Sequence, residues 1–436
     1  MRVSEAILTR RTARTFEPRP VPPDVLDEVL RAGMWAPSAR NWQPWRFIVV
    51  HDGADKTFLH ELALESKEIS AWWVPMFRPE GLREYIQDLE RTPVTLIVTA
   101  DPEARGRHVG DRWGHILGAA MAVENIKLMA HAHGLGVVQY THWVEEKVNV
   151  YFNIPRLWNL VGVLCMGTPV RLDTKERQSA LKRRPLHDIA FAERFGEKHA
   201  WQAPAFADVA DIREAVFQRR SVRRFLAEAV TDGQLAQILA AAQWAPSAGN
   251  HQPWRFIVVR DAETKQALQA NAGEAHALSR RWQSGNPADG ELEPPFDYTQ
   301  ASLLIAIAAD PARGGPHIHG EATHMIAAGL CAQNMALMAH ALGLGSVFLN
   351  HLSHEQAKVL LGIPYELDLA GVMAFGRPAE TPRSERMDRA RVVYDGGFED
   401  RKGFTAVGVR HSGMREALAE YDVWRKRQGG EGPATR

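Results

Sequence analysis

The sequence predicts two copies of one α+β domain joined in a single chain. Residues 36–50 return as residues 245–259 with only two differences, which fall at Arg40 and Trp42 of the first copy. Shorter stretches return at the same offset of 209 residues. In both halves, helical patterns alternate with short apolar runs of the kind that buried strands need. The period is too long for a solenoid or a propeller, so it indicates duplication of a complete domain of ordinary size.

The first helices are predicted from their start and stop signals. Residues 3–11 predict a short helix, and the next helix begins at Pro22 and Pro23, because a proline in the first turn lacks only a donor that has no helical partner. Its counterpart begins at Thr231, which has the spacing of a capping box with Gln234. Both of these helices are expected to end before a loop that starts with Pro-Ser, because proline cannot continue a helix.

The remaining core elements are predicted from apolar runs and small residues. Glycines after the long helices are expected to stop them and lead into a strand. Long loops that carry aromatic residues, within residues 51–93 and 260–302, predict either a lid over a site or local packing. The expected strands are residues 47–50, 95–100, 162–167, 256–259, 303–308 and 371–376, and the expected central helices are residues 115–133 and 324–342.

Composition narrows the class of protein. The 436 residues contain 52 Lys and Arg against 52 Asp and Glu, so no basic field argues for a nucleic-acid or membrane partner. Cys165 and Cys331 are too few for a disulfide framework, and we expect both to be core residues in a reducing compartment. The chain has neither an apolar signal core at its start nor a run of about 18 apolar residues. We therefore expect a cytoplasmic protein without nucleic-acid or membrane partners.

Two polar segments of each half are candidates for binding. Arginines cluster at residues 10–14 and again at 219–223. Such a cluster is either a solvated surface or an arm that binds an anion, and its repetition favours the arm, because guanidinium groups match phosphate oxygens bidentately. The Pro-Ser loops are either ordinary turns or small-residue loops whose N–H groups can approach a planar ring closely.

The order of these motifs resembles one family. Both halves contain Arg-Arg-Ser/Thr-x-Arg, Pro-Ser-x-x-Asn-x-Gln-Pro-Trp, Gly-Leu-Gly, Ile-Pro and Gly-x-Pro in this order, which is similar to the FMN-dependent nitroreductases. The resemblance implies α+β domains with a mixed or antiparallel central sheet flanked by helices, packed as an intramolecular pseudo-dimer. It places domain 1 at residues 1–195, domain 2 at residues 210–410, and a partly disordered extension at residues 411–436. Since the family's dimer interface would lie inside one chain, we expect a monomer.

The resemblance also implies two FMN sites, each built from both halves. In each site, arginines of one half would hold the phosphate, Arg14 or Arg223 would lie near the pyrimidine edge, and the Pro-Ser loop of the other half would pack on the flavin. Site one takes Arg10, Arg11, Thr12, Arg14, Arg183 and Arg184 from the first half and Pro246, Ser247, Ala248 and Asn250 from the second. Site two takes Arg219, Arg220, Ser221, Arg223 and Arg386 from the second half and Pro37, Ser38, Ala39 and Asn41 from the first.

The chain departs from the family pattern beside the expected flavin N5 edge. Where the family usually has glycine, this sequence has His142 and His351. These two histidines are the candidate catalytic residues, as proton donors or as groups that restrict substrate size, unless both point away from the site. Several other histidines repeat between the halves, but their spacing gives no HExxH pattern and no cysteine partner, so we expect no metal site.

The implied activity is oxidoreduction. NAD(P)H would deliver hydride to the bound FMN, and an electrophilic small molecule, of nitroaromatic, quinone or enone type, would take the two electrons in a ping-pong cycle. Two alternatives remain open at this point. One is a flavin-binding or sequestering protein with a covered flavin and little turnover, and the other is a flavin-dependent dehydrogenase that acts in biosynthesis.

Overall fold

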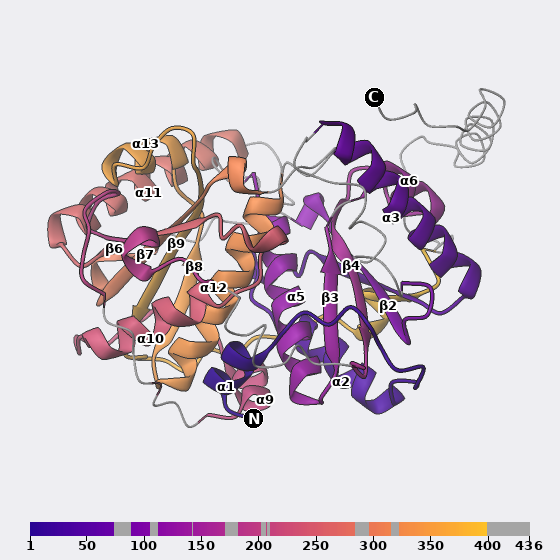
Figure 1. Cartoon of the computed structure of the whole chain (residues 1–436). Helices are drawn as coiled ribbons and strands as arrows, with labels where there is room; N and C mark the ends of the chain where they lie inside the picture. The colour runs from indigo at the N-terminus through magenta and orange to yellow at the C-terminus, as the bar shows by residue number, and fades with distance from the viewer. Residues whose placement is uncertain are drawn as a thin grey trace.

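The chain forms two α+β halves, each built on a five-stranded sheet flanked by helices (Figure 1). The fold predicted from the duplication is therefore confirmed. The computed structural model describes residues 1–73, 89–104, 112–141, 143–170, 182–201, 206, 210–283, 296–314 and 322–398. The expected extension at residues 411–436 lies outside the described residues. Within the part that is described, no helix is long and apolar enough to cross a membrane.

Both sheets are mixed and have the same topology. The first has the order β10-β1-β2-β4-β3 and the second the order β5-β6-β7-β9-β8. All pairs within a sheet are antiparallel except β1 with β10 and β5 with β6, which are parallel. The strands are β1 (Trp45–Val50), β2 (Val94–Ala100), β3 (Gly136–Tyr140), β4 (Asn159–Gly167), β5 (Ala190–Ala192), β6 (Trp254–Val259), β7 (Leu303–Ala309), β8 (Gly345–Leu349), β9 (Asp368–Gly376) and β10 (Val393–Asp395).

Each half gives its last short strand to the sheet of the other half. Strand β10 follows the second half in sequence but pairs with β1, where the Phe47 N–H donates to the Val392 carbonyl at 2.8 Å. Strand β5 follows the first half but pairs with β6, where the Glu193 N–H donates to the Val258 carbonyl at 2.7 Å. The sequence did not predict this exchange. The domain boundaries at residues 195 and 210 stay a prediction. They describe the order along the chain only, since each sheet is completed by a strand of the other half.

Two long apolar helices, α5 (Gly114–Ala132) and α12 (Thr323–Ala341), pack against each other between the two sheets (Figure 1). Their small residues allow a close approach: a Cβ atom added to Gly329 would lie 2.7 Å from the Ala120 Cβ and 2.9 Å from the Leu117 carbonyl oxygen. The Gln333 side chain donates to the Asn125 Oδ1 across the same interface at 2.6 Å. One hydrophobic core therefore runs through both halves, which gives the intramolecular pseudo-dimer.

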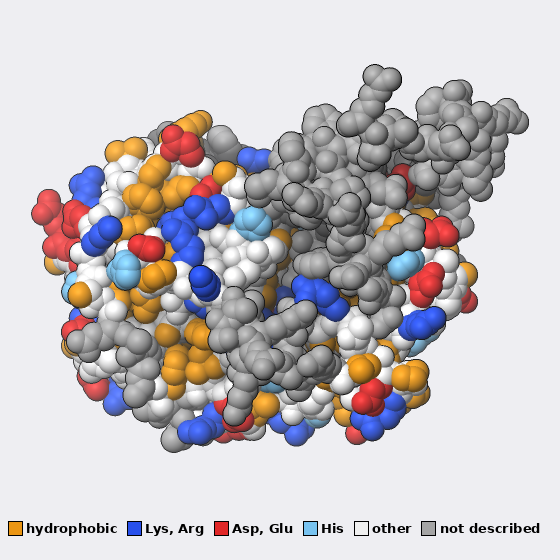
Figure 2. Space-filling model, in the orientation of Figure 1, with side chains coloured by type: hydrophobic (Ala, Val, Ile, Leu, Met, Phe, Trp, Pro, Cys, Tyr) orange, Lys and Arg blue, Asp and Glu red, His pale blue; other side chains and the backbone are white. Residues whose placement is uncertain are grey.

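The other helices cover the sheets and tie the halves together. The N-terminal ammonium group of Met1 forms an ion pair with the Asp211 carboxylate at 2.8 Å, which joins the start of the first half to the start of the second. On the face shown in Figure 2, acidic and basic side chains are interspersed over the described residues. The helices other than α5 and α12 are α1 (Val3–Thr9), α2 (Pro23–Met34), α3 (Gly53–Trp73), α6 (Glu145–Tyr151), α8 (Leu186–Ile189), α9 (Ile212–Gln218), α10 (Asp232–Gln243), α11 (Ala262–Gln283) and α13 (His354–Leu360).

Candidate functional site

The arginine arms leave their helices as extended chain and run beside a sheet. Helix α1 ends at Thr9 because Arg10 already has extended backbone angles (φ −55°, ψ 132°). Thr12 then forms a parallel bridge to Val137 of β3, and Ser221 forms the matching bridge to Ser346 of β8. This fixed course places the side chains that follow each helix at the end of a sheet, next to the helix pair.

The first arginine of each arm is buried and the second stacks on the other half. Arg10 is 8% exposed and Arg219 is 3% exposed. The Arg220 guanidinium lies 4.4 Å from the ring centre of Trp35, and that of Arg11 lies 5.2 Å from the ring centre of Trp244. Since both tryptophans belong to the opposite half, each arm already reaches across the pseudo-dimer.

The two Pro-Ser loops share an unusual backbone conformation. Arg40, Asn41 and Gln43 have φ of 46°, 58° and 53°, and the matching residues of the second loop have φ of 54°, 58° and 49°. Non-glycine residues in this region cost energy, so the surrounding structure must hold them there. The Ser38 hydroxyl does so by accepting the Gln43 N–H at 2.9 Å. Strain kept twice at the same place favours a binding role over an ordinary turn.

Each half has another arginine in the segment that precedes its exchanged strand, which we call its tail. This arginine binds the tail to the Pro-Ser loop of the other half. Arg183 Nη1 donates to Asn250 Oδ1 at 2.6 Å, and Arg386 Nη1 donates to Asn41 Oδ1 at 3.0 Å. Arg386 is therefore the structural counterpart of Arg183, which the sequence alone could not align. The Arg184 N–H donates to the Gln252 side chain at 2.8 Å, but the Arg184 side chain lines neither pocket described below.

The first pocket, of about 360 Å³, brings the predicted first-site residues together. Its walls are the arm of the first half, the end of β3, the loop of the second half and helix α12. Among the residues expected from the sequence, those that line it are Arg10, Arg11, Thr12, Arg14, Arg183, Pro246, Ser247, Ala248 and Asn250.

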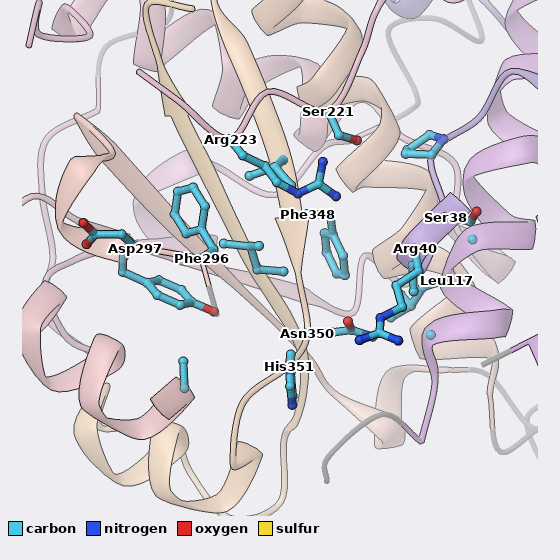
Figure 3. Close-up of a pocket in the computed structure, with 18 of the residues that line it drawn as sticks. Ser38, Arg40, Leu117, Ser221, Arg223, Phe296, Asp297, Phe348, Asn350 and His351 are labelled. Carbon is cyan, nitrogen blue, oxygen red and sulfur yellow. The ribbon is translucent and has the colours of Figure 1, made fainter. Parts of the chain in front are cut away.

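The second pocket, of about 750 Å³, has the same construction with the halves exchanged. Its walls are the second arm, the end of β8, the first loop and helix α5 (Figure 3). Of the expected residues, Pro37, Ser38, Ala39, Ser221 and Arg223 line it, whereas Asn41, Arg219, Arg220 and Arg386 do not. Asn41 and Arg386 are bonded to each other, and Arg386 is close enough to Arg219 to affect its ionisation.

The positive charges of Arg183, Arg219 and Arg386 are poorly balanced by nearby acidic groups. Burial, together with the nearby Arg386 and Arg220, lowers the pKa of Arg219 to about 9. Burial, followed by repulsion from Arg10 and Arg11, lowers the pKa of Arg183 to about 10. The buried Nε atoms of Arg183, Arg219 and Arg386 have no hydrogen-bond partner among the described residues. Such groups fit an anion, which would supply both the missing acceptor and the missing charge.

Some pocket residues were not expected from the sequence. In the first pocket, Lys127 donates from Nζ to Gln139 Oε1 at 2.6 Å, and burial lowers the pKa of Lys127 while the neighbouring Glu124 opposes this. In the second pocket, Phe348 occupies the position that matches Gln139, and Phe296 and Tyr298 form another part of the wall. No motif marks these positions. A long loop within residues 260–302 was expected either to cover a site or to pack locally, but residues 262–283 form helix α11, and Phe296 and Tyr298 after it line the pocket.

Of the two candidate catalytic histidines, only His351 lies within the described residues. His142 lies outside the described residues. His351 lines the second pocket and lies 3.2 Å from the Ser279 hydroxyl through its Nε2. Burial, with smaller effects of His276 and Arg40, lowers the pKa of His351 to about 4. The imidazole is therefore neutral at neutral pH, so it can offer one N–H and one lone pair but no charge.

The described residues contain no group of three or more His, Cys, Asp and Glu that could hold a metal ion. Three of the repeated histidines instead lie within hydrogen-bond distance of a polar side chain. His115 Nε2 lies 2.8 Å from Asn159 Oδ1, and His324 Nε2 lies 2.7 Å from Asp368 Oδ2. His131 Nε2 lies 2.8 Å from the Thr9 hydroxyl. These histidines have structural contacts at helices α5 and α12.

Known proteins resemble each half of the chain. The NADH dehydrogenase of Thermus thermophilus is 33% identical over 209 residues, which cover 42% of this chain and 96% of that protein. The 5,6-dimethylbenzimidazole synthase of Rhodospirillum rubrum is 30% identical over 193 residues, which cover 42% of this chain and 90% of that protein. A crystal structure of a Desulfovibrio desulfuricans protein in complex with FMN is 32% identical and covers 43% of this chain and 96% of that one, with a TM-score of 0.34.

The family comparison covers most of the chain. The model of the nitroreductase family matches residues 7–168 and matches again at residues 216–377. Both matches begin before an arginine arm and end inside the Gly-x-Pro turn, so each contains the motifs in order up to the glycine of that turn. This chain therefore belongs to the nitroreductase family, and it carries two copies of the family's domain.

Proposed function

We propose that the chain is an FMN-dependent oxidoreductase that takes hydride from NAD(P)H and reduces an electrophilic small molecule, of nitroaromatic, quinone or enone type, by a ping-pong mechanism. The observation that carries the proposal is the crossed construction of the two pockets. Each pocket joins the arginine arm of one half to the strained Pro-Ser loop of the other. A cation cluster beside a small-residue loop suits a ligand with a phosphate at one end and a flat ring at the other.

The buried arginines would hold the phosphate of the cofactor. Arg10 and Arg183 would do so at the first site, and Arg219 and Arg386, which lie beside the second pocket, at the second. Arg10 and Arg219 are buried. The buried Nε atoms of Arg183, Arg219 and Arg386 have no partner among the described residues. Arg14 and Arg223 line the pockets further along each arm. They would place positive charge near the ring, where it stabilises negative charge that develops there. Bound FMN would supply the hydride chemistry itself.

The chain's own residues would orient the reactants and exclude water. Helix α12 closes the inner wall of the first pocket and helix α5 that of the second, mostly with apolar side chains, which would exclude water and strengthen the electrostatics of each site. At the second site, neutral His351 stands beside Asn350 at the end of β8 (Figure 3). We propose that His351 either donates a hydrogen bond to the acceptor or limits its size.

A spectrum of the purified protein followed by anaerobic addition of NADH or NADPH tests the proposal. We expect absorbance bands of oxidised flavin, rapid bleaching by at least one nicotinamide, and recovery of the bands when a quinone is added. A protein that binds no flavin would refute the cofactor assignment. A flavin that stays oxidised with both nicotinamides would refute the NAD(P)H oxidoreductase and favour a flavin-binding protein without turnover.

One comparison supports a second candidate. The similarity to 5,6-dimethylbenzimidazole synthase, at 30% identity, favours an enzyme that acts in biosynthesis. Such an enzyme would share the two pockets but differ in the compound that occupies the space beside the flavin. Turnover of simple quinones and nitroaromatics at rates far below the rate of flavin reduction would favour this candidate.

We further propose that the protein acts as a monomer in the cytoplasm. The interface between two domains of this family is already formed inside the chain by α5 and α12. Cys165 and Cys331 are both free and buried, which suits a reducing compartment. Sedimentation of the flavin-loaded protein tests the monomer, and a stable dimer of full chains would contradict it.

A further inference from the structure

The two Pro-Ser loops differ at a residue that lines a pocket in each case. The first loop has Arg40 where the second has Gly249, although both residues have positive φ, 46° and 54°. Glycine adopts this conformation without strain, whereas arginine does not. A Cβ atom added to Gly249 would lie 2.5 Å from the His251 ring, so a side chain at this position would also require the exposed His251 to move. The arginine is therefore a costly feature that is confined to the second site.

Arg40 presents a cation that the described residues leave without an acid. Its guanidinium lies 5.7 Å from the ring centre of Trp42, and within the described ranges it has no hydrogen bond and no ion pair. Figure 3 shows it pointing into the second pocket beside Asn350, with His351 next to them. The carboxylate that lines this pocket, Asp297, points away from Arg40 in the same view.

The hydrogen bonds of Asp297 explain why it does not neutralise Arg40. Its Oδ1 accepts the Thr299 N–H at 3.0 Å, and its Oδ2 accepts the Gln300 side-chain amide at 2.9 Å, so it caps a short helix. His276 adds a polar group near Arg40: its ring centre lies 5.7 Å from that of His351, and its buried Nδ1 has no partner among the described residues. Burial, Arg280 and Arg40 lower the pKa of His276, and burial, His276 and Arg40 lower that of His351, so neither imidazole carries a charge that competes with Arg40 at neutral pH.

The wall on the other side of the pocket is aromatic. Phe296 lies edge to face with Tyr298, with ring centres 5.4 Å apart. Phe348 stands between the arm and the first loop, in the position that Gln139 takes at the first site (Figure 3). A flat apolar ring can pack against these side chains, whereas the first pocket offers Gln139 and Lys127 at the same level.

We propose that the second pocket binds an aromatic electron acceptor that carries an anionic group such as a carboxylate, and that Arg40 recognises this group. The proposal rests on the proposed function, since the acceptor would occupy the space that bound FMN leaves in the pocket. Guanidinium binds carboxylate through two parallel hydrogen bonds, which also orients the ring. The first pocket has Gly249 at this position and does not share the preference.

Matched acceptors and matched variants test the assignment. We would measure kcat/KM of the flavin-loaded protein for 4-nitrobenzoate and for neutral 4-nitrobenzyl alcohol, each reduced by two electrons and two protons to the nitroso compound and water. The variants are Arg40→Gly, which copies the second loop at the first pocket, and Arg40→Lys, which keeps the charge but loses the two parallel N–H donors of the guanidinium. Arg156→Gln is the control, because Arg156 is exposed and lines neither pocket.

We expect Arg40→Gly to lower kcat/KM for the carboxylate about tenfold more than for the alcohol, a value reduced from that of a buried pair because Arg40 is partly exposed. Arg40→Lys should recover part of the loss, and the preference should weaken with added salt. An equal fall for both acceptors would refute the proposal. A change confined to the KM for NADPH, with that for NADH unaffected, would show that Arg40 binds the cofactor's phosphate instead and would also refute it.

A binding measurement separates this inference from the proposed function. Calorimetry with benzoate and with benzyl alcohol needs no turnover, so it applies even if neither acceptor is reduced and the proposed oxidoreductase activity fails. We expect benzoate to bind to about one site per chain and to lose affinity in Arg40→Gly but not in Arg156→Gln. Benzoate binding that does not depend on Arg40, or no binding of benzoate, would overturn the inference.

Discussion

Asn41 and Arg219 should serve the same flavin although they belong to different halves. The Asn41 side chain accepts from Arg386 at 3.0 Å and donates to the Glu385 carbonyl at 2.8 Å, so it holds the tail of the second half. Arg219 is 3% exposed and lies close to Arg386. If the pockets are crossed, the double variant Asn41→Ala with Arg219→Ala damages one site only. The double variant Asn41→Ala with Arg10→Ala damages both.

The expected magnitude follows from the burial of these groups. A charge-assisted contact from a buried arginine contributes about 1.5–3 kcal/mol, which corresponds to about ten- to hundredfold in affinity. The neutral hydrogen bond from Asn41 to the Glu385 carbonyl contributes about 0.5–1.5 kcal/mol, and the charge-assisted bond that Asn41 accepts from Arg386 contributes about 1.5–3 kcal/mol at most. Deflavinated protein would be titrated with FMN and followed by calorimetry. The first double variant should keep about one tight site per chain, and the second should keep none.

A matched control excludes a general effect of changes near the tail. Arg389 forms an exposed ion pair with Asp27 at 3.1 Å, and it lines neither pocket. Arg389→Ala should leave both sites tight, because exposed pairs contribute little. If the variant with Asn41 and Arg10 changed together is the one that retains a tight site, each site is built within one half. That result would refute the crossed arrangement.

Three further predictions concern the cofactor, the helix interface and pH. Denatured protein should release FMN, because the arginine clusters suit one terminal phosphate and the sequence has no Gly-x-Gly-x-x-Gly fingerprint for a pyrophosphate; chromatography that finds FAD alone would contradict this. Gly329→Val should lower the free energy of unfolding by about 1–3 kcal/mol or more, because the larger side chain overpacks against Ala120. Gly273→Ala should not lower it, because a Cβ atom added there meets nothing within 4 Å. Equal urea midpoints for the two variants would refute the argument. Burial raises the pKa of Glu145 from 4.5 to about 7, so the folded protein binds more protons than the unfolded chain between these values and loses stability as pH rises from about 4.5 to 7. Glu145→Gln should remove this component, and a stability difference from wild type that does not vary with pH in denaturant titrations would show the assignment to be wrong.

The repeat and the strong apolar runs made most of the fold predictable. The buried strands were found within a few residues of their limits, since central strands buried on both faces carry continuous apolar runs. Helix α1 was predicted to reach Arg11 but ends at Thr9, because the arm that follows needs extended backbone to bridge β3. The exchanged strands were missed because three residues, such as Ala190–Ala192 and Val393–Asp395, are too short to show a period.

The candidate site was predictable where both copies kept the same motif. The arms and the Pro-Ser loops could be paired by offset alone, and the structure brings them together. Arg386 could not be aligned, because the tails differ in length; its bonds to Asn41 and to the Trp35 carbonyl show that it matches Arg183. Arg40 gave no signal beyond one mismatch in a repeated stretch, since its meaning depends on a positive φ and on what surrounds it in space.

The exchange of strands has a consequence for how the protein is made. Strand β1 begins at Trp45, but its outer neighbour β10 begins only at Val393, so β10 leaves the ribosome long after β1. At ordinary rates of synthesis the edge of the first sheet therefore stays open for roughly tens of seconds. An open edge of buried, apolar strand residues is a template for pairing with other chains. The nascent protein should need protection at β1 until its own C-terminal segment arrives, and a chain that stops short of residue 393 should aggregate.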